Sequence, residues 1–112
     1  MNILFICSRN KRRSLTAEAI YKGMQAQDIV AKSAGTEPSA TTKITAKLLL
    51  WADVIFVMEK DHIQRMADRF PLEVMEKEIV ILNIPDEYEF MDPELVESIK
   101  TQVDACLTEM NR

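Results

Sequence analysis

The sequence predicts an α/β fold in which a four-stranded parallel sheet carries helices on both faces. Short apolar runs alternate along the chain with amphipathic stretches, which is the pattern of consecutive βα units. The 112 residues suit one domain, which we expect to span residues 1–112. A hydrophobic content of 47% lets the chain bury enough surface to fold, so intrinsic disorder is excluded.

The strands are expected at the apolar runs. Residues 2–7 (NILFIC) form a nearly continuous apolar run, which is typical of a strand buried on both faces. Further runs predict strands over residues 29–34, 52–58 and 78–82. No repeat, linker or low-complexity segment interrupts the alternation, so right-handed crossovers should connect the strands.

Helices are expected between and after these runs. Helical patterns cover the stretch from Ser14, a favoured N-cap residue, to near Gly23, and residues 41–50 and 59–70. Asp92 and Pro93 should begin the last helix, with Asp92 as its N-cap and Pro93 at its first position.

The composition and the N-terminus indicate a small cytoplasmic protein without a membrane anchor. The longest apolar runs, such as residues 54–58, are far shorter than the ~20 residues of a membrane span. The N-terminus has neither a basic segment nor a small-residue cleavage site, so we expect no signal peptide. Cys7 and Cys106 lie at opposite ends of the chain and offer no disulfide framework, which fits a reducing compartment.

One cluster of positive charge lies in an otherwise acidic chain. Arg9, Lys11, Arg12 and Arg13 lie within five consecutive residues, whereas the rest of the chain has 10 basic and 18 acidic residues. A nucleic-acid-binding surface needs basic residues spread over a face, so a nucleic-acid partner is not expected. The cluster indicates a compact anion site, although a charge run alone is more often a solvated surface loop.

The loop from Cys7 to Ser14 has the residues and the position of a phosphate-binding site. In parallel α/β folds, ligands bind outside the carboxyl ends of the strands, and this loop joins the first strand to a helix. Backbone N–H groups and the helix dipole can bind a tetrahedral dianion there, and Arg13 can hold two of its oxygens. The same positive potential stabilises a thiolate, so we expect Cys7 to be a nucleophile and Ser14 to donate a hydrogen bond to its sulfur.

The remaining loop residues are candidates for contact with the phosphate. They are Ser8, Arg9, Asn10, Lys11 and Arg12. The three basic side chains are expected mainly to point to solvent and raise the local potential, while Asn10 suits a left-handed backbone. The plain alternative is that Cys7 is only a small core residue and Arg13 a surface cation.

Cys7-x5-Arg13-Ser14 at a strand-to-helix turn resembles the low-molecular-weight protein tyrosine phosphatase family. The resemblance extends to residues 33–36 (Ser-Ala-Gly-Thr), to the third strand ending in Met58, and to residues 86–88, which are similar to the general-acid loop Asp-Pro-Tyr. It implies a phosphatase P-loop after the first strand and hydrolysis of phosphotyrosine-like aryl phosphates through a phosphocysteine. We expect the strand order 2-1-3-4.

The chain departs from the family pattern as an abridged version with several substitutions. Arg9 replaces the usual glycine, Arg12 replaces a second loop cysteine, and Leu15 and Glu87 replace prolines. These changes leave the nucleophile and the loop arginine in place. They bear on substrate preference and redox regulation.

Two carboxylates compete for the role of general acid. Asp92 already has a structural role as a helix cap. Asp86 has none, and it lies in a polar loop after the fourth strand, on the same edge of the sheet as Cys7. We therefore favour Asp86, which would protonate the leaving oxygen and then activate water. Tyr88 is either a wall of the cleft or a surface aromatic.

No metal ion or other cofactor is expected. His62, the only histidine, should lie on the polar side of its helix as a bystander, with no cysteine or carboxylate at metal-ligand spacing. Cys106 lies on the apolar stripe of the last helix and is expected in the core.

These features together predict a metal-independent phosphomonoesterase whose partner is a phosphorylated protein or a small aryl phosphate. One alternative is a phosphate-binding module, for example for nucleic-acid ends, in which Cys7 has no chemical role. A second is a phosphocysteine carrier of the sugar phosphotransferase type, against which Arg13 and Ser14 argue. An arsenate reductase would need two further cysteines, and only Cys106 is available. No particular oligomeric state is implied.

Overall fold

Strands and helices alternate in the computed structural model, which describes residues 1–22 and 28–110. In chain order the elements are β1 (Asn2–Cys7), α1 (Arg13–Lys22), β2 (Val30–Gly35), α2 (Ala46–Trp51), β3 (Val54–Val57), α3 (Asp61–Arg69), α4 (Pro71–Met75), β4 (Glu78–Ile81) and α5 (Pro93–Met110). The end of the first helix, predicted near Gly23, lies outside the described residues. None of the helices within the described ranges is long and apolar enough to cross a membrane.

The four strands form a parallel sheet in the order β2-β1-β3-β4, which confirms the predicted fold class. Their carboxyl ends meet at one edge, where Cys7 lies opposite Gly35 and Ile6 lies opposite Val57. The chain runs outward from β1 to β2 and then returns to β3, so the strand order reverses between β1 and β3. Ligands bind at such a switch point, and the loop after Cys7 begins there.

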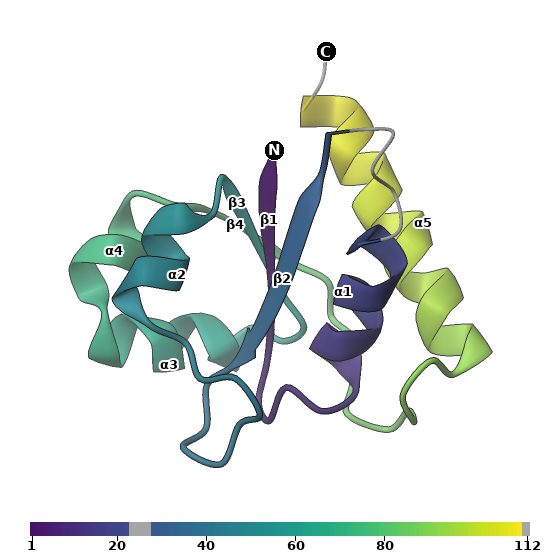
Figure 1. The fold of residues 1–112 in the computed structure, drawn as a ribbon, viewed down its shortest axis with the longest axis horizontal. Coiled ribbons are helices and arrows are strands. Elements are labelled where there is room, and N and C mark those ends of the chain that lie inside the picture. Colours follow the sequence, from purple (N-terminus) through teal and green to yellow (C-terminus); the bar gives the residue numbers. More distant parts are fainter. Residues whose placement is uncertain (23–27, 111–112) are drawn as a thin grey trace.

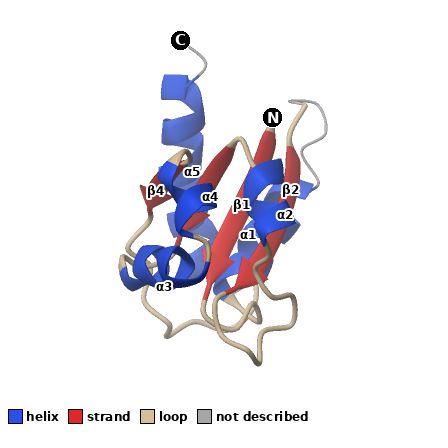
Figure 2. Ribbon diagram, turned by 90° about the vertical axis from the view of Figure 1, so that its left-hand side faces the viewer, coloured by secondary structure: helices blue, strands red, loops and turns tan. Residues whose placement is uncertain are grey.

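Helices cover both faces of the sheet. Figure 1 shows α1 and α5 on one side of it and α2, α3 and α4 on the other, and Figure 2 gives the perpendicular view. Successive side chains of β1 alternate between the two cores: Phe5 packs under α1 and α5, and Leu4 and Ile6 pack on the opposite face. The Phe5 ring stacks on Tyr21 and Phe56, with centroids 5.7 and 5.5 Å apart. Burial on both faces explains the continuous apolar run and fixes the base of the loop.

The third predicted helix, over residues 59–70, is α3, which ends before Pro71 as expected, and a further short helix that was not predicted follows it. α3 begins at Asp61 and ends at Arg69, and α4 begins at Pro71. Proline is favourable in the first turn of a helix but cannot continue one, so the chain stops and starts again there.

The second predicted helix begins later than residue 41. α2 starts at Ala46, after Thr45, whose side chain accepts a hydrogen bond from Leu48 N at 3.1 Å. The residues before it continue beside the end of β2, where Gly35 N donates to Thr42 O at 2.8 Å. This pairing keeps the segment extended, so the apolar pattern alone misplaced the helix start.

Gly35, the last residue of β2, lies too close to the Cys7 loop to carry a side chain. A Cβ atom there would be 2.6 Å from the carbonyl oxygen of Ser8 and 2.7 Å from the Cβ of Ala40. The first of these is a backbone atom of the loop, which cannot rotate away. The absence of a side chain at Gly35 therefore allows β2 and the loop to pack together.

Gly35→Ala is expected to destabilise the protein by about 1–3 kcal/mol, the usual cost of an overpacked site. Urea denaturation of both proteins measures the difference. Adding Ala40→Gly removes only one of the two close contacts, so the double variant should recover only part of the loss. An unchanged denaturation midpoint for Gly35→Ala would show that the loop moves freely.

Candidate active site

The backbone of the Cys7 loop is held so that its N–H groups point to one side. The carbonyls of Cys7, Ser8 and Arg9 each accept a hydrogen bond, at 2.9–3.0 Å, from N–H groups of residues 36–41 after β2. In a planar trans peptide, the C=O and the following N–H point in opposite directions. The N–H groups of residues 8–10 therefore point away from that segment, and the one of Asn10 reaches Cys7 Sγ at 3.2 Å.

A directed chain of hydrogen bonds ends at the sulfur of Cys7. Thr42 N donates to Asn10 Oδ1 at 3.2 Å, which leaves the Asn10 amide nitrogen to donate to Ser14 Oγ at 2.7 Å. Ser14 Oγ is in turn 2.9 Å from Cys7 Sγ. Because the serine oxygen accepts from Asn10, its own proton can be donated to the sulfur. This arrangement suits a thiolate, which accepts hydrogen bonds.

Ser14 is thus not the N-cap that its position in the sequence suggests. α1 begins one residue earlier, at Arg13, and Thr16 N donates to the carbonyl of Arg12 at 2.9 Å. The Ser14 hydroxyl instead turns toward Cys7 and is completely buried. The Ser14 hydroxyl therefore hydrogen-bonds to the sulfur of Cys7, whereas main-chain groups form the hydrogen bond at the start of α1.

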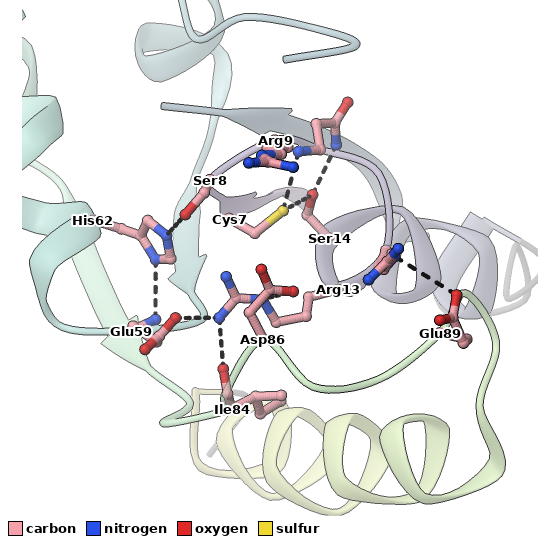
Figure 3. A network of polar contacts seen from close by, with 12 residues as sticks. Cys7, Ser8, Arg9, Arg13, Ser14, Glu59, His62, Ile84, Asp86 and Glu89 are labelled. Atoms are coloured by element: carbon pink, nitrogen blue, oxygen red, sulfur yellow. Dashed lines mark hydrogen bonds and ion pairs between the residues drawn. The ribbon is translucent and has the colours of Figure 1, made fainter. Parts of the chain in front are cut away.

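Arg13 is buried, with 2% of its surface exposed, and its guanidinium is fixed by acceptors from two other strand ends. Its Nη1 donates to the carboxylate of Glu59, after β3, and to the carbonyl of Ile84, after β4, at 2.7 Å. Its Nε is 3.8 Å from Oδ1 of Asp86. Figure 3 shows these groups converging beside Cys7. The surface-cation alternative does not fit this geometry.

A pocket of about 80 Å³ lies beside Cys7 and Arg13. Its lining residues are Cys7, Arg9, Lys11, Arg12, Arg13 and Asp86. Since a water molecule occupies roughly 30 Å³ in the liquid, the volume equals two to three waters. The pocket is therefore large enough for one small anion.

The basic side chains at the rim are exposed, as expected, and two of them lie near carboxylates. Arg9 Nε is 3.5 Å from Glu37, and Arg12 Nε is 3.7 Å from Glu89. Lys11 is also exposed. Exposed ion pairs of this kind contribute little to stability, so their main effect is on the potential at the pocket.

The structure separates the two carboxylates that compete for the acid role. Asp86 lines the pocket with Cys7. Asp92 caps α5, because its Oδ1 accepts a hydrogen bond from Glu94 N at 2.9 Å, and it is not among the pocket residues. Tyr88 is not among the pocket residues, and it packs half-buried against the core under α1 and α5.

The structure adds two residues that the sequence analysis missed and shows Ser8 in a different role. His62 is fully buried, so the expectation of a bystander on the polar side of a helix is wrong. Its Nε2 is 3.0 Å from Ser8 Oγ, which turns the Ser8 side chain away from the pocket (Figure 3). Ser8 can therefore offer the anion only its backbone N–H. The other missed residue is Glu59, the partner of Arg13.

The sequence contained a signal that Glu59 and His62 lie near the site. Glu59 and His62 directly follow the third strand, at the edge of the sheet where ligands bind. His62 also lies four residues before the apolar Met66, so the two side chains share one face of a helix. With α3 beginning at Asp61, His62 lies in the first turn and faces the loop.

Carboxylates do lie at metal-ligand distance from the histidine, contrary to the sequence analysis. Ligand atoms of Glu59, Asp61 and His62 lie within 4.8 Å of one another. Both imidazole nitrogens are already used, however, because Nδ1 accepts from Glu59 N at 3.1 Å and Nε2 contacts Ser8. A metal ligand needs a free nitrogen lone pair, which this arrangement does not offer.

Comparison with known proteins agrees with this site. Residues 2–50 match the family described as Low molecular weight phosphotyrosine protein phosphatase. No curated protein matches the chain. The match over the loop agrees with the resemblance seen in the sequence.

Solved structures of phosphatases share the fold over nearly the whole chain. A protein tyrosine phosphatase from Entamoeba histolytica is 20% identical, with a TM-score of 0.75 over 99% of this chain and 96% of its own. A low molecular weight protein tyrosine phosphatase from Bacillus subtilis is 21% identical, with a TM-score of 0.74 over 100% of both chains. The YwlE arginine phosphatase from Geobacillus stearothermophilus is 20% identical, with a TM-score of 0.72 over 96% of this chain and 94% of its own. At these identities the likeness shows the fold alone.

Asn10 has a left-handed backbone, with φ of 55°, as its residue type suggested. Asn10→Gly keeps that conformation and loses the side-chain hydrogen bonds, whereas Asn10→Ala loses the bonds and strains the backbone. Asn10→Ala should therefore be less stable than Asn10→Gly by about 1–2 kcal/mol, the cost of a left-handed non-glycine residue. Thermal unfolding of the two variants provides the comparison. Equal stabilities would mean that the loop changes conformation without its asparagine.

Proposed function

We propose that this chain, which matches the low molecular weight phosphotyrosine protein phosphatases over residues 2–50, hydrolyses phosphomonoesters through a phosphocysteine formed on Cys7. One observation carries the proposal. The sulfur of Cys7 lines a pocket of the size of one anion, together with Arg13 and Asp86. Nucleophile, anion clamp and proton donor are thus present in one small space.

In the first step, Cys7 Sγ attacks phosphorus while the bond from phosphorus to the ester oxygen breaks. The inward N–H groups of the loop and the guanidinium of Arg13 bind the equatorial oxygens, where charge is stabilised in the transition state. Asp86 gives its proton to the leaving oxygen. The products are an alcohol or phenol and a phosphorylated Cys7.

In the second step, water attacks the phosphorus and the bond to sulfur breaks. Asp86, now ionised, takes a proton from that water, so the same carboxylate acts as acid and then as base. The Ser14 hydroxyl and Asn10 N–H, which both contact Cys7 Sγ, stabilise the departing thiolate. Inorganic phosphate leaves and the site returns to its starting state.

The size of the pocket supports a substrate that inserts only its phosphate. The remaining part of the substrate then lies among the exposed side chains of Arg9, Lys11 and Arg12. We take the substrate class to be aryl phosphates of the phosphotyrosine type, on a protein or a small molecule. The family match is the support for this choice.

The geometry favours this function over the two non-hydrolytic alternatives. In a pure phosphate-binding module the sulfur would have no reason to lie in the pocket with two hydrogen-bond donors. A phosphocysteine carrier has no need of a buried arginine beside the nucleophile. Both cysteines are free thiols, and a reactive thiol needs a reducing compartment, so we also propose a cytoplasmic location.

Cys7→Ser is expected to abolish hydrolysis of para-nitrophenyl phosphate, since a serine hydroxyl is a poorer nucleophile than a thiolate and the hydrogen-bond partners of the residue 7 sulfur, Ser14 Oγ and Asn10 N, are not bases. The loop N–H groups and Arg13 remain, so the variant should still bind phosphate or vanadate. Rates are measured with a chelator present, and oxyanion binding by calorimetry. More than a few per cent of the wild-type rate in the variant would exclude the phosphocysteine mechanism.

Asp86→Asn should slow the same reaction by roughly 10²–10⁴-fold, the scale of losing a positioned proton donor. Asp92→Asn is the matched control, since asparagine caps a helix as well as aspartate does. The opposite result, with a silent Asp86→Asn and a damaging Asp92→Asn, would assign the acid to the helix cap.

A further inference from the structure

We propose that His62 is a positioning residue of the anion site, which as a neutral imidazole holds both the loop after Cys7 and the segment that pairs with Arg13. The inference rests on the proposed phosphatase function, because it adds a residue on which the same site depends. His62 does not line the pocket, so its effect must pass through the groups that it touches.

His62 connects two segments that are far apart in the sequence. It is the second residue of α3 and has no exposed surface. Its ring lies between the hydroxyl of Ser8 and the backbone of Glu59, as Figure 3 shows. One segment forms the anion loop, and the other supplies the carboxylate bound to Arg13.

The hydrogen bonds of the ring define its tautomer. A backbone N–H can only donate, so the bond from Glu59 N requires an unprotonated Nδ1. The neutral ring must then carry its proton on Nε2, which donates to Ser8 Oγ at 3.0 Å. The two contacts are therefore possible together only while His62 is neutral.

On the loop side, the contact holds the residue that follows the nucleophile. Ser8 is fixed at its hydroxyl by His62 and at its carbonyl by Glu37 N, 2.9 Å away. These two bonds orient the peptide between Ser8 and Arg9. The N–H of that peptide is one of those that point toward the anion.

On the other side, the contact fixes the start of the turn that carries Glu59. The backbone of Glu59 donates to the imidazole, and its carboxylate accepts from Arg13. The guanidinium is also held by the carbonyl of Ile84. His62 thus helps to fix the arginine that clamps the phosphate, without touching it.

Protonation of His62 would break this arrangement. A second proton on Nδ1 would face the Glu59 N–H, so two donors would oppose each other. Burial lowers the pKa of His62, which favours the neutral form near pH 7. Asp61 and Glu59 act against burial and raise that pKa, whereas Arg13 and Arg65 lower it.

Lowering the pH should remove the contribution of His62 to the site. The neutral ring is the working form, so its contribution is complete above the pKa of His62 and is lost as the pH falls through it. The same group lowers stability at acid pH, because the unfolded chain binds the proton more readily than the folded one. Activity and stability should thus weaken together on the acid side.

His62→Gln and Ser8→Ala test the contact from its two ends. Each should weaken binding of inorganic phosphate, and lower kcat/KM for para-nitrophenyl phosphate, by roughly 2- to 10-fold, the scale of one hydrogen bond. The double variant should lose no more phosphate affinity and no more kcat/KM than the more impaired of the two single variants, because both changes remove the same contact. Fully additive losses, or wild-type values in both single variants, would overturn the proposal. Ser8→Ala keeps the test available even if His62→Gln does not fold.

Charge changes on α3 test the pH effect without altering any pocket residue. Asp61→Asn should move the acid-side fall of kcat/KM to lower pH, and Arg65→Gln should move it to higher pH. Neither shift should occur in the His62→Gln background, although the substrate phosphate titrates equally in all variants. The exposed Gln64→Ala on the same helix is the control and should change nothing. Shifts that persist without His62, or that are absent with it, would refute the role of its protonation.

Phosphate binding separates this inference from the proposed function. A wild-type protein that binds phosphate but hydrolyses no aryl phosphate would contradict the proposed function alone. The dissociation constant for phosphate in the His62 and Ser8 variants, measured across the same pH range, would then still decide the role of His62. Unchanged phosphate affinity in those variants would overturn it whether or not the protein is a phosphatase.

Discussion

The burial of one guanidinium is the constraint around which the candidate site is arranged. A buried charge is costly unless it is paired and hydrogen-bonded, and Arg13 is almost completely buried. Its partners come from the segment after β3, which supplies Glu59, and from the segment after β4, which supplies Ile84 and Asp86. One cation that follows β1 therefore draws together three of the four carboxyl ends of the sheet. The same contacts bring Asp86 to the nucleophile.

The architecture was predictable because its signals are local or follow from general rules. An apolar run such as residues 2–7 predicts a buried strand, and the alternation of elements limits the topology to a few choices. The Cys-x5-Arg-Ser spacing could be interpreted for the same reason, since all of its residues lie in one loop. Asp86 could be preferred over Asp92 because Asp-Pro at a helix start already accounts for Asp92.

What the sequence did not predict depends on long-range contacts and on small shifts of helix ends. Glu59 and His62 act on residues 46 and 54 positions away, a distance over which no local pattern carries information. The start of α2 differs from the predicted one because residues 42–44 run beside Gly35, the last residue of β2, with which Thr42 and Ile44 form backbone hydrogen bonds.

That support is made of main-chain groups, and this has a consequence for how the protein tolerates sequence change. The donors at positions 36, 37 and 41 are backbone N–H groups, which every residue except proline provides. Pro38 lies within the same segment but at a position that supplies none of these bonds. The segment can therefore vary widely in side chains as long as proline stays out of these positions and out of position 42, whose N–H binds Asn10, and Gly35 keeps its place. A scaffold of this kind can persist in proteins that share only a fifth of their residues, as the solved phosphatases do with this chain.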